Sequence, residues 1–134
     1  RNRRCPAWCI HAYLQQHPGV DWVSYAALED SEYYPTCRKI TGGRASGILS
    51  FGIHGGKEAG AKFIDALQMI LRLVNIGDAK SLACHPATTT HRQLGPEELA
   101  TAGVSEDMVR LSIGIEHPDD IIADIEQALA DAAA

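Results

Sequence analysis

The alternation of apolar and polar side chains along the chain predicts three β-strands. Residues 20–25, 47–54 and 108–116 each alternate with a period of two, which is typical of a strand with one buried face. The third segment alternates over the greatest length and divides its side chains into two sets. One face then holds Met108, Arg110, Ser112, Gly114 and Glu116, and the other holds Val109, Leu111, Ile113 and Ile115.

Apolar positions three and four residues apart predict helices beside these strands. Helices are expected over residues 5–16, 57–74 and 96–103, and from Pro118 into the alanine tail. The second has a stripe formed by Phe63, Leu67, Ile70, Leu71 and Val74, and the last has one formed by Ile121, Ile122, Ile125, Ala128 and Leu129. A turn and a short strand are predicted over 75–83. Residues 28–44 show no period, which predicts a long surface connection.

These elements predict an α/β fold in which helices cover one face of a mostly antiparallel, open sheet. The chain has 134 residues, of which 46% are hydrophobic. That is enough for one core and too little for two. We therefore expect a single domain over residues 1–134, with residues 1–13 as a divergent or frayed end.

Composition and charge exclude several classes of function. Twelve basic and 17 acidic residues give a net charge of −5, and the chain has no basic stripe of the kind that binds nucleic acid. No apolar run approaches the roughly 20 residues that cross a bilayer, so we expect a cytoplasmic protein without a membrane partner. The four cysteines form no CxxC pair and show no zinc-ligand spacing, which predicts reduced thiols and no metal site.

Two segments with candidate chemistry have simpler structural interpretations. Residues 52–57 form a glycine-rich turn between a strand and a helix, but a Walker loop needs glycine in place of Phe51 and serine or threonine in place of Glu58. A chain reversal is favoured there. In the loop 84–92, Cys84 beside His85 suggests a thiolate nucleophile or a metal ligand. Adjacent strand residues point to opposite faces, however, so a turn stabilised by threonine hydroxyls, with Cys84 in the core, is favoured.

Arg110 is the third candidate, because it lies on the polar face of an otherwise apolar strand. Its small neighbours on that face leave room for a ligand, and a guanidinium group matches a carboxylate in bidentate geometry. The alternatives are an exposed strand arginine and an arginine paired with a glutamate. The pattern alone leaves all three open.

Three separated motifs resemble one enzyme family. The segments 75–82 (NIGDAKSL), 85–94 (HPATTTHRQL) and 110–116 (RLSIGIE) occur in this order in the C-terminal part of the Cys/Met-metabolism family of pyridoxal-phosphate (PLP) enzymes. The family includes cystathionine synthases and lyases, methionine γ-lyase and O-acetylhomoserine sulfhydrylase. The residues of the first two motifs, together with the sequence SFG at 50–52 upstream, are most similar to the O-acetylhomoserine sulfhydrylase branch. Lyases of the family usually have ESL and MTH at the corresponding positions of these two motifs.

The resemblance implies the small C-terminal domain of a fold-type I PLP-dependent transferase. It implies that Arg110 binds the α-carboxylate of the substrate, that Asn75 and Ile76 border the same carboxylate, and that Thr90 lies near Arg110 and orients it. The family's cofactor lysine stands in a Ser-x-Thr-Lys context in the large domain. None of the four lysines here has that context, so we expect the PLP-binding domain to be absent from this chain, and the chain alone to be inactive.

The implied activity is γ-replacement on O-acetylhomoserine, which yields homocysteine or methionine. PLP would supply the electron sink for removal of the substrate's protons. The implied partners are an amino-acid substrate and sulfide or a thiol, and the complete relatives are usually homotetramers. A γ-lyase, a cystathionine γ-synthase and a non-catalytic gene fragment are the alternatives.

Overall fold

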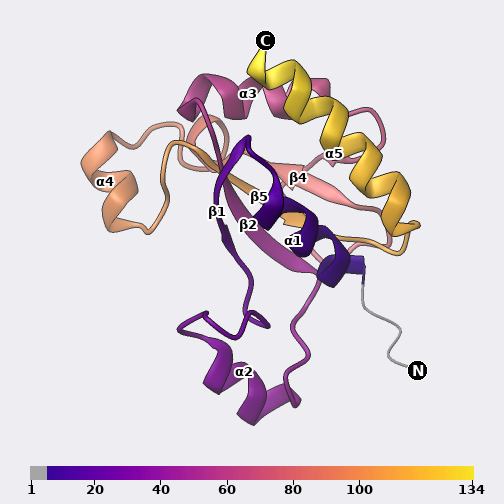
Figure 1. Cartoon of the computed structure of the whole chain (residues 1–134). Coiled ribbons are helices and arrows are strands. Elements are labelled where there is room, and N and C mark those ends of the chain that lie inside the picture. The colour runs from indigo at the N-terminus through magenta and orange to yellow at the C-terminus, as the bar shows by residue number, and fades with distance from the viewer. Residues whose placement is uncertain (1–5) are drawn as a thin grey trace.

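The computed structural model describes residues 6–134, and all structural statements below concern that part of the chain. Its elements are α1 (Pro6–Gln16), β1 (Val20–Ser24), α2 (Tyr34–Thr41), β2 (Ile48–Ile53), α3 (Gly56–Ala66), β3 (Leu71–Arg72), β4 (Leu82–Cys84), the 3₁₀ turn η1 (Pro86–Thr88), α4 (Pro96–Thr101), β5 (Met108–Ser112) and α5 (Pro118–Ala133). Figure 1 shows their arrangement.

The strands form one sheet in the order β1-β2-β5-β4-β3. All neighbours are antiparallel except β3 and β4, which are parallel. The predicted mostly antiparallel sheet is therefore confirmed. The last long strand of the sequence, β5, takes the central place, so the residues on its two faces lie in the middle of the molecule.

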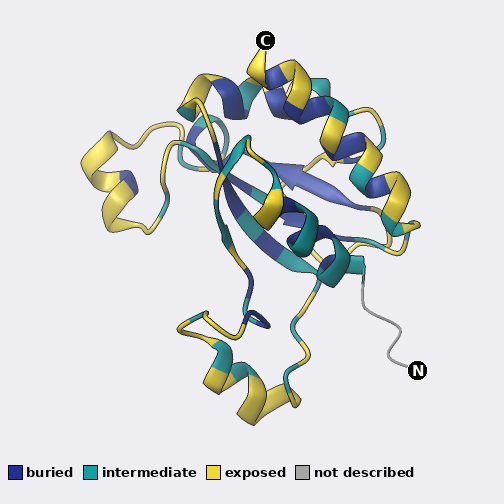
Figure 2. Ribbon diagram, viewed as in Figure 1, coloured by how far each residue is buried: buried dark blue, intermediate teal, exposed yellow. Residues whose placement is uncertain are grey.

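Helices α1, α3 and α5 cover one face of the sheet, as predicted (Figure 1). The core lies between these helices and the sheet, where Phe51, Val109 and Leu111 are fully buried (Figure 2). Phe51 meets Phe63 of α3 edge to face, with ring centroids 5.6 Å apart. Ile115 was expected on this buried face but is 83% exposed, because β5 ends at Ser112 and the chain turns away.

Helix α3 ends at Ala66, so the helix predicted to continue to Val74 is wrong over its last two turns. The carboxylate of Asp124 on α5 accepts hydrogen bonds from the backbone N–H groups of Gln68, Met69 and Ile70, at 2.9, 3.0 and 2.8 Å. These donors would otherwise bond within a continuing helix. The chain instead passes into the short edge strand β3.

The expected surface connection over 28–44 contains a helix, α2, which projects from the body of the molecule (Figures 1 and 2). None of its residues is buried, so the helix packs no apolar face against the core. Its boundary signals are present, since Pro35 is in the first turn and Gly42 closes the helix in a left-handed conformation (φ 67°).

The N-terminal segment packs on the core from its first described turn. Residues 6–13, part of the end expected to be divergent or frayed, belong to α1, where Ala7 and Ile10 are fully buried. The remainder of that expectation, residues 1–5, lies outside the described residues. No helix among residues 6–134 combines the length and apolar character that a membrane crossing requires.

Candidate functional site

Arg110 lies at the centre of the sheet, on the face that the three core helices leave uncovered. Across β5 it is in register with Ser50 of β2 and with Cys84 of β4. Directly opposed residues of neighbouring strands project from the same face, so these three side chains form one row. The alternation of β5 predicted this placement, and Val109 and Leu111 on the other face are buried as expected.

The guanidinium group of Arg110 is held by the backbone and not by a carboxylate. Its Nη2 donates to the carbonyl oxygen of Val74, just beyond β3. Within residues 6–134, no aspartate or glutamate forms an ion pair with Arg110. A guanidinium has five N–H donors, and this bond uses one of them. Arg110 is also partly exposed, so its other donors are open to an incoming anion.

Asn75 and Ile76, the two residues predicted to border the same ligand, directly follow the carbonyl that holds Arg110. Both are exposed, Ile76 by 56%. Residue 77, which follows them, donates its backbone N–H to the hydroxyl of Ser112 at 3.0 Å. The structure thus brings Arg110, Asn75 and Ile76 together from segments that are 34 or more residues apart.

Thr90 lies in the turn after η1 and is exposed. Its hydroxyl shares a 2.8 Å hydrogen bond with Nδ1 of the next residue, His91. Among the described residues, Thr90 and Arg110 share no hydrogen bond. The role of Thr90 in orienting Arg110 therefore stays a prediction.

The loop that begins at Cys84 is a structural turn. Cys84 is 2% exposed, and burial raises the pKa of its thiol, while the positive charge of Arg110 lowers it in part. A buried neutral thiol is a poor nucleophile. The hydroxyls of Thr88 and Thr89 both donate to the carbonyl oxygen of His85, at 3.2 and 2.8 Å, as expected for a turn stabilised by threonines.

The glycine-rich turn at 52–57 reverses the chain, as favoured from the sequence. Gly55 and Gly56 have φ angles of 103° and 71°, a conformation that side-chain-bearing residues rarely adopt. Within the described part of the chain, no group of three or more His, Cys, Asp or Glu side chains could hold a metal ion.

The described residues do not fit a Schiff-base site for PLP. Such a lysine must lie in a pocket where a ring can be held, and Lys39, Lys57, Lys62 and Lys80 are all exposed. Lys62 pairs with Glu58 at 3.7 Å on the outer surface of α3. Nothing in the geometry of residues 6–134 therefore supports a covalent link to the cofactor.

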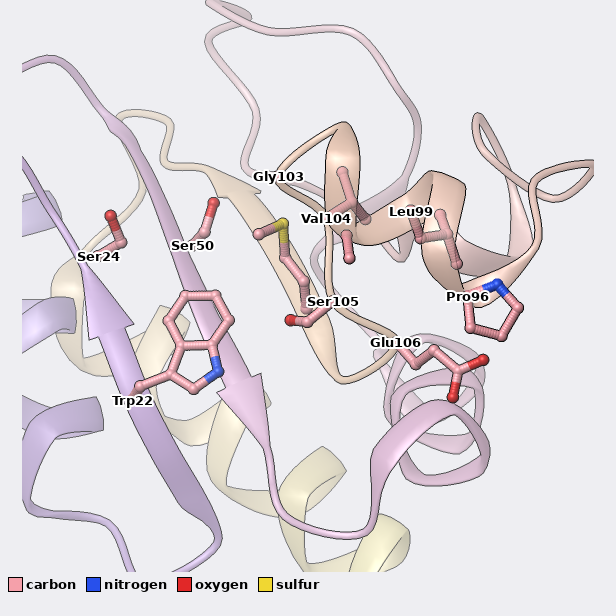
Figure 3. A pocket seen from close by; sticks show the side chains of 11 residues that line it. Trp22, Ser24, Ser50, Pro96, Leu99, Gly103, Val104, Ser105 and Glu106 are labelled. Atoms are coloured by element: carbon pink, nitrogen blue, oxygen red, sulfur yellow. The ribbon is translucent and has the colours of Figure 1, made fainter.

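A groove of about 480 Å³ lies on the same face of the sheet; Ser50 and Met108 line it, but Arg110 does not. Trp22, Ser24 and Ser50 project from β1 and β2 on one side, and the loop and helix around Leu99 form the other side (Figure 3). The indole of Trp22 donates to the carboxylate of Asp107 at 2.9 Å, which holds the ring in place. The open face thus carries Arg110 on β5 and, separately, a partly apolar groove.

The sequence pattern assigned no role to Ser112 or Glu116, although Ser112 accepts from the backbone N–H of Gly77 and Glu116 accepts from Ser81, both just after Asn75 and Ile76 in the chain. Ser112 and Glu116 share the face of Arg110 in the alternation of β5 and beyond. That shared face was the signal that could have identified them.

Known proteins with similar sequences are sulfur amino-acid enzymes. An O-acetyl-L-homoserine sulfhydrylase of Leptospira meyeri is 50% identical over 122 residues, which cover 90% of this chain and 27% of that protein. An O-acetyl-L-homoserine sulfhydrylase 1 of Thermus thermophilus is 47% identical over 118 residues, covering 88% and 28% respectively. A homocysteine synthase of Schizosaccharomyces pombe is 46% identical, covering 92% and 29%. The chain therefore spans less than a third of each relative.

A solved structure shows the same fold. It is a crystal structure described as an O-acetylhomoserine (thiol)-lyase from Campylobacter jejuni that carries a pyridoxyl-lysine phosphate. It superposes with a TM-score of 0.86 at 40% identity, over 93% of this chain and 30% of that one. The family of Cys/Met metabolism PLP-dependent enzymes matches residues 2–130, and the chain belongs to this family.

Proposed function

We propose that this chain supplies the carboxylate-binding part of a PLP-dependent enzyme that acts on O-acetylhomoserine. In the proposed reaction the Cγ–O bond to acetate breaks and a Cγ–S bond to sulfide or a thiol forms, which gives homocysteine or methionine. The names of the relatives support this choice of substrate and reaction. Arg110 would bind the α-carboxylate, with Asn75 and Ile76 beside it.

The observation that carries the proposal is the state of Arg110. It is a partly exposed arginine in the middle of the uncovered sheet face, with no acidic partner among the described residues and with one N–H fixed on the carbonyl of Val74. That backbone bond orients the planar guanidinium and leaves donors for a bidentate carboxylate. An arginine that served only to stabilise the fold would be expected to pair with one of the chain's own carboxylates.

Arg110 would contribute to the reaction by orientation. A carboxylate held at two points fixes the direction of the bonds at the adjacent Cα, and such positioning lowers the barrier of any reaction at that carbon.

The proposal is tested in a chimera, because the chain covers only part of its relatives. This chain replaces the matching C-terminal segment of the Thermus thermophilus sulfhydrylase, and homocysteine formation from O-acetyl-L-homoserine and sulfide is measured. We expect Arg110→Ala to lower kcat/KM by about 10- to 100-fold, the loss expected for a charge-assisted hydrogen-bonded pair. Arg110→Lys should recover part of the loss, since it restores the charge without the fork.

Arg72→Ala is the matched control, because Arg72 is also an arginine of the sheet but pairs with Asp65 at 3.0 Å on the surface. It should leave kcat/KM within about twofold, as expected for an exposed pair. The visible absorbance of PLP shows that each chimera has bound its cofactor. An unchanged kcat/KM in the loaded Arg110→Ala chimera contradicts the role of Arg110. A 2-oxoacid as the main product in place of homocysteine contradicts γ-replacement.

A further inference from the structure

The face of β5 that carries Arg110 continues past the end of the strand as a row of contacts to one segment, residues 74–81. Arg110 bonds the carbonyl oxygen of Val74. Ser112 accepts from the backbone N–H of Gly77 at 3.0 Å. Gly114, next on the same face, donates its backbone N–H to the hydroxyl of Ser81 at 2.9 Å. Every second residue from 110 to 114 is therefore bonded to this segment, in the same order along both stretches.

Glu116 completes the row. Its carboxylate accepts from the backbone N–H of Ser81 at 2.7 Å and from the hydroxyl of Ser81 at 2.8 Å. The backbone N–H of Ile115 donates to the carbonyl of Ala79 at 2.9 Å. A Cβ atom at position 114 would collide with that same carbonyl, so only glycine allows this approach.

Hydrophobic burial does not explain why the segment is held so firmly. All residues from 71 to 80 are exposed, including Val74 at 48% and Ile76 at 56%. The groups that hold the segment are the buried ones, since Ser81 is fully buried and Ser112 is 3% exposed. An exposed stretch with no buried apolar side chain is thus fixed by buried hydroxyls and a carboxylate. Such an arrangement sets the position of the stretch and adds little to the core.

The fixed stretch is the one that flanks Arg110. The bonds from Arg110 to Val74 and from Gly77 to Ser112 bracket Asn75 and Ile76, and no other residue lies between the two anchors. The two bonds restrict movement of the stretch relative to β5 and so relative to Arg110. Glu116, through Ser81, fixes the far end of the same segment.

We infer that Ser112 and Glu116 are positioning residues, which hold Asn75 and Ile76 at the distance from Arg110 that a bound α-carboxylate requires. This inference rests on the proposed role of Arg110. It adds that the preference for a carboxylate over a neutral group depends on Ser112 as well as on Arg110.

The test measures selectivity in the chimera described above. Inhibition constants are determined for L-homoserine, which has the carboxylate, and for L-homoserinamide, which replaces it with a neutral amide. We expect Ser112→Ala to reduce the ratio of the two constants by about 3- to 10-fold, the effect of one lost hydrogen-bond restraint. Glu116→Gln should act in the same direction, because an amide nitrogen cannot accept from Ser81. A loss of folded protein would lower the rate at every inhibitor concentration and leave both constants, and so their ratio, unchanged.

Hydrogen–deuterium exchange gives a readout that is independent of activity. In Ser112→Ala the amides of residues 75–80 should exchange faster, while those of β5 stay protected. The matched controls are Ser46→Ala, an exposed serine just before β2, and Glu126→Gln, an exposed glutamate of α5. Neither should change the ratio or the exchange of this segment.

The outcomes separate the two proposals. If Arg110→Ala abolishes selectivity for the carboxylate but Ser112→Ala and Glu116→Gln leave it intact, the positioning inference is wrong and the role of Arg110 stands. If Arg110→Ala also leaves selectivity intact, the proposed function itself fails. Should Ser112→Ala prevent folding, Glu116→Gln decides the question, because its carboxylate lies nearer the surface.

Discussion

A Cβ atom at position 60 of α3 would lie 2.5 Å from Nε2 of His85, so the imidazole occupies space that only glycine leaves. His85 is 1% exposed, and its two ring nitrogens contact the hydroxyl of Thr88 at 2.9 Å and the carbonyl of Glu106 at 2.7 Å. The threonine turn was predictable from residues 85–91. The contact with position 60 was not, because the two sites are 25 residues apart and glycine gives no apolar signal.

Gly60→Ala should therefore destabilise the protein by about 1–3 kcal/mol, the usual cost of overpacking a core. Helix propensity alone predicts the opposite sign, since alanine in a helix is favoured over glycine by about 1 kcal/mol. Urea denaturation of the chain measures the difference. Lys62→Ala on the exposed surface of the same helix is the control and should have little effect. Equal or greater stability of Gly60→Ala would show that His85 moves aside without cost.

At the scale of elements, the strands were easier to predict than the ends of the helices. Strand positions follow from alternation within a few residues, and β1, β2 and β5 lie where the alternation put them. The end of α3 depends on Asp124, which stands more than 50 residues later in the chain. The apolar residues after Ala66 keep a helical spacing, but the backbone N–H groups of residues 68–70 donate to the carboxylate of Asp124 in α5.

Asp124→Asn should unfold at a lower urea concentration, with a loss of about 2–3 kcal/mol. Asp124 is 6% exposed, and its two oxygens accept three backbone hydrogen bonds. An asparagine offers one acceptor oxygen and turns its NH₂ group toward donors, so buried N–H groups lose their partners. Asp131→Asn, an exposed position of the same helix, should change stability by less than about 0.5 kcal/mol. If both variants unfold at the same urea concentration, Asp124 is not what ends α3.

At the scale of the whole molecule, the chain is a sheet with one core face and one open face, and the candidate site lies on the open one. The order of predicted strands and helices was sufficient to predict the fold class, and the alternation of β5 was sufficient to place Arg110 on the polar face. The alternation could not identify the residues that bond to this face. Segment 74–81 lies beside β5 only because of the strand order, in which β4 lies between β3 and β5. The positions of Asn75 and Ile76 came from resemblance, and the bonds that hold them came from the structure.

The whole molecule should lose stability in two stages as the pH falls. His11 and His85 are buried, and burial lowers the pKa of each below 6.5, against smaller opposing effects of backbone hydrogen bonds. Unfolding exposes both rings, and the unfolded chain then binds protons that the folded chain does not. The free energy of unfolding must therefore fall as the pH drops below about 6.5.

Glu116 produces the second stage. Burial and the negative charge of Asp78 raise the pKa of its carboxyl, but hydrogen bonds from the backbone and hydroxyl of Ser81 and from its own backbone N–H together lower it more, so the folded pKa lies below 4.5. Its contribution is complete above pH 4.5 and is lost as the pH falls through the folded value. Urea midpoints measured from pH 7.5 to 3.5 should decline in both ranges. Glu116→Gln should remove part of the lower decline only. A midpoint that stays level between pH 7 and 5 would mean that the two buried imidazoles take up protons in the folded state, which their burial opposes.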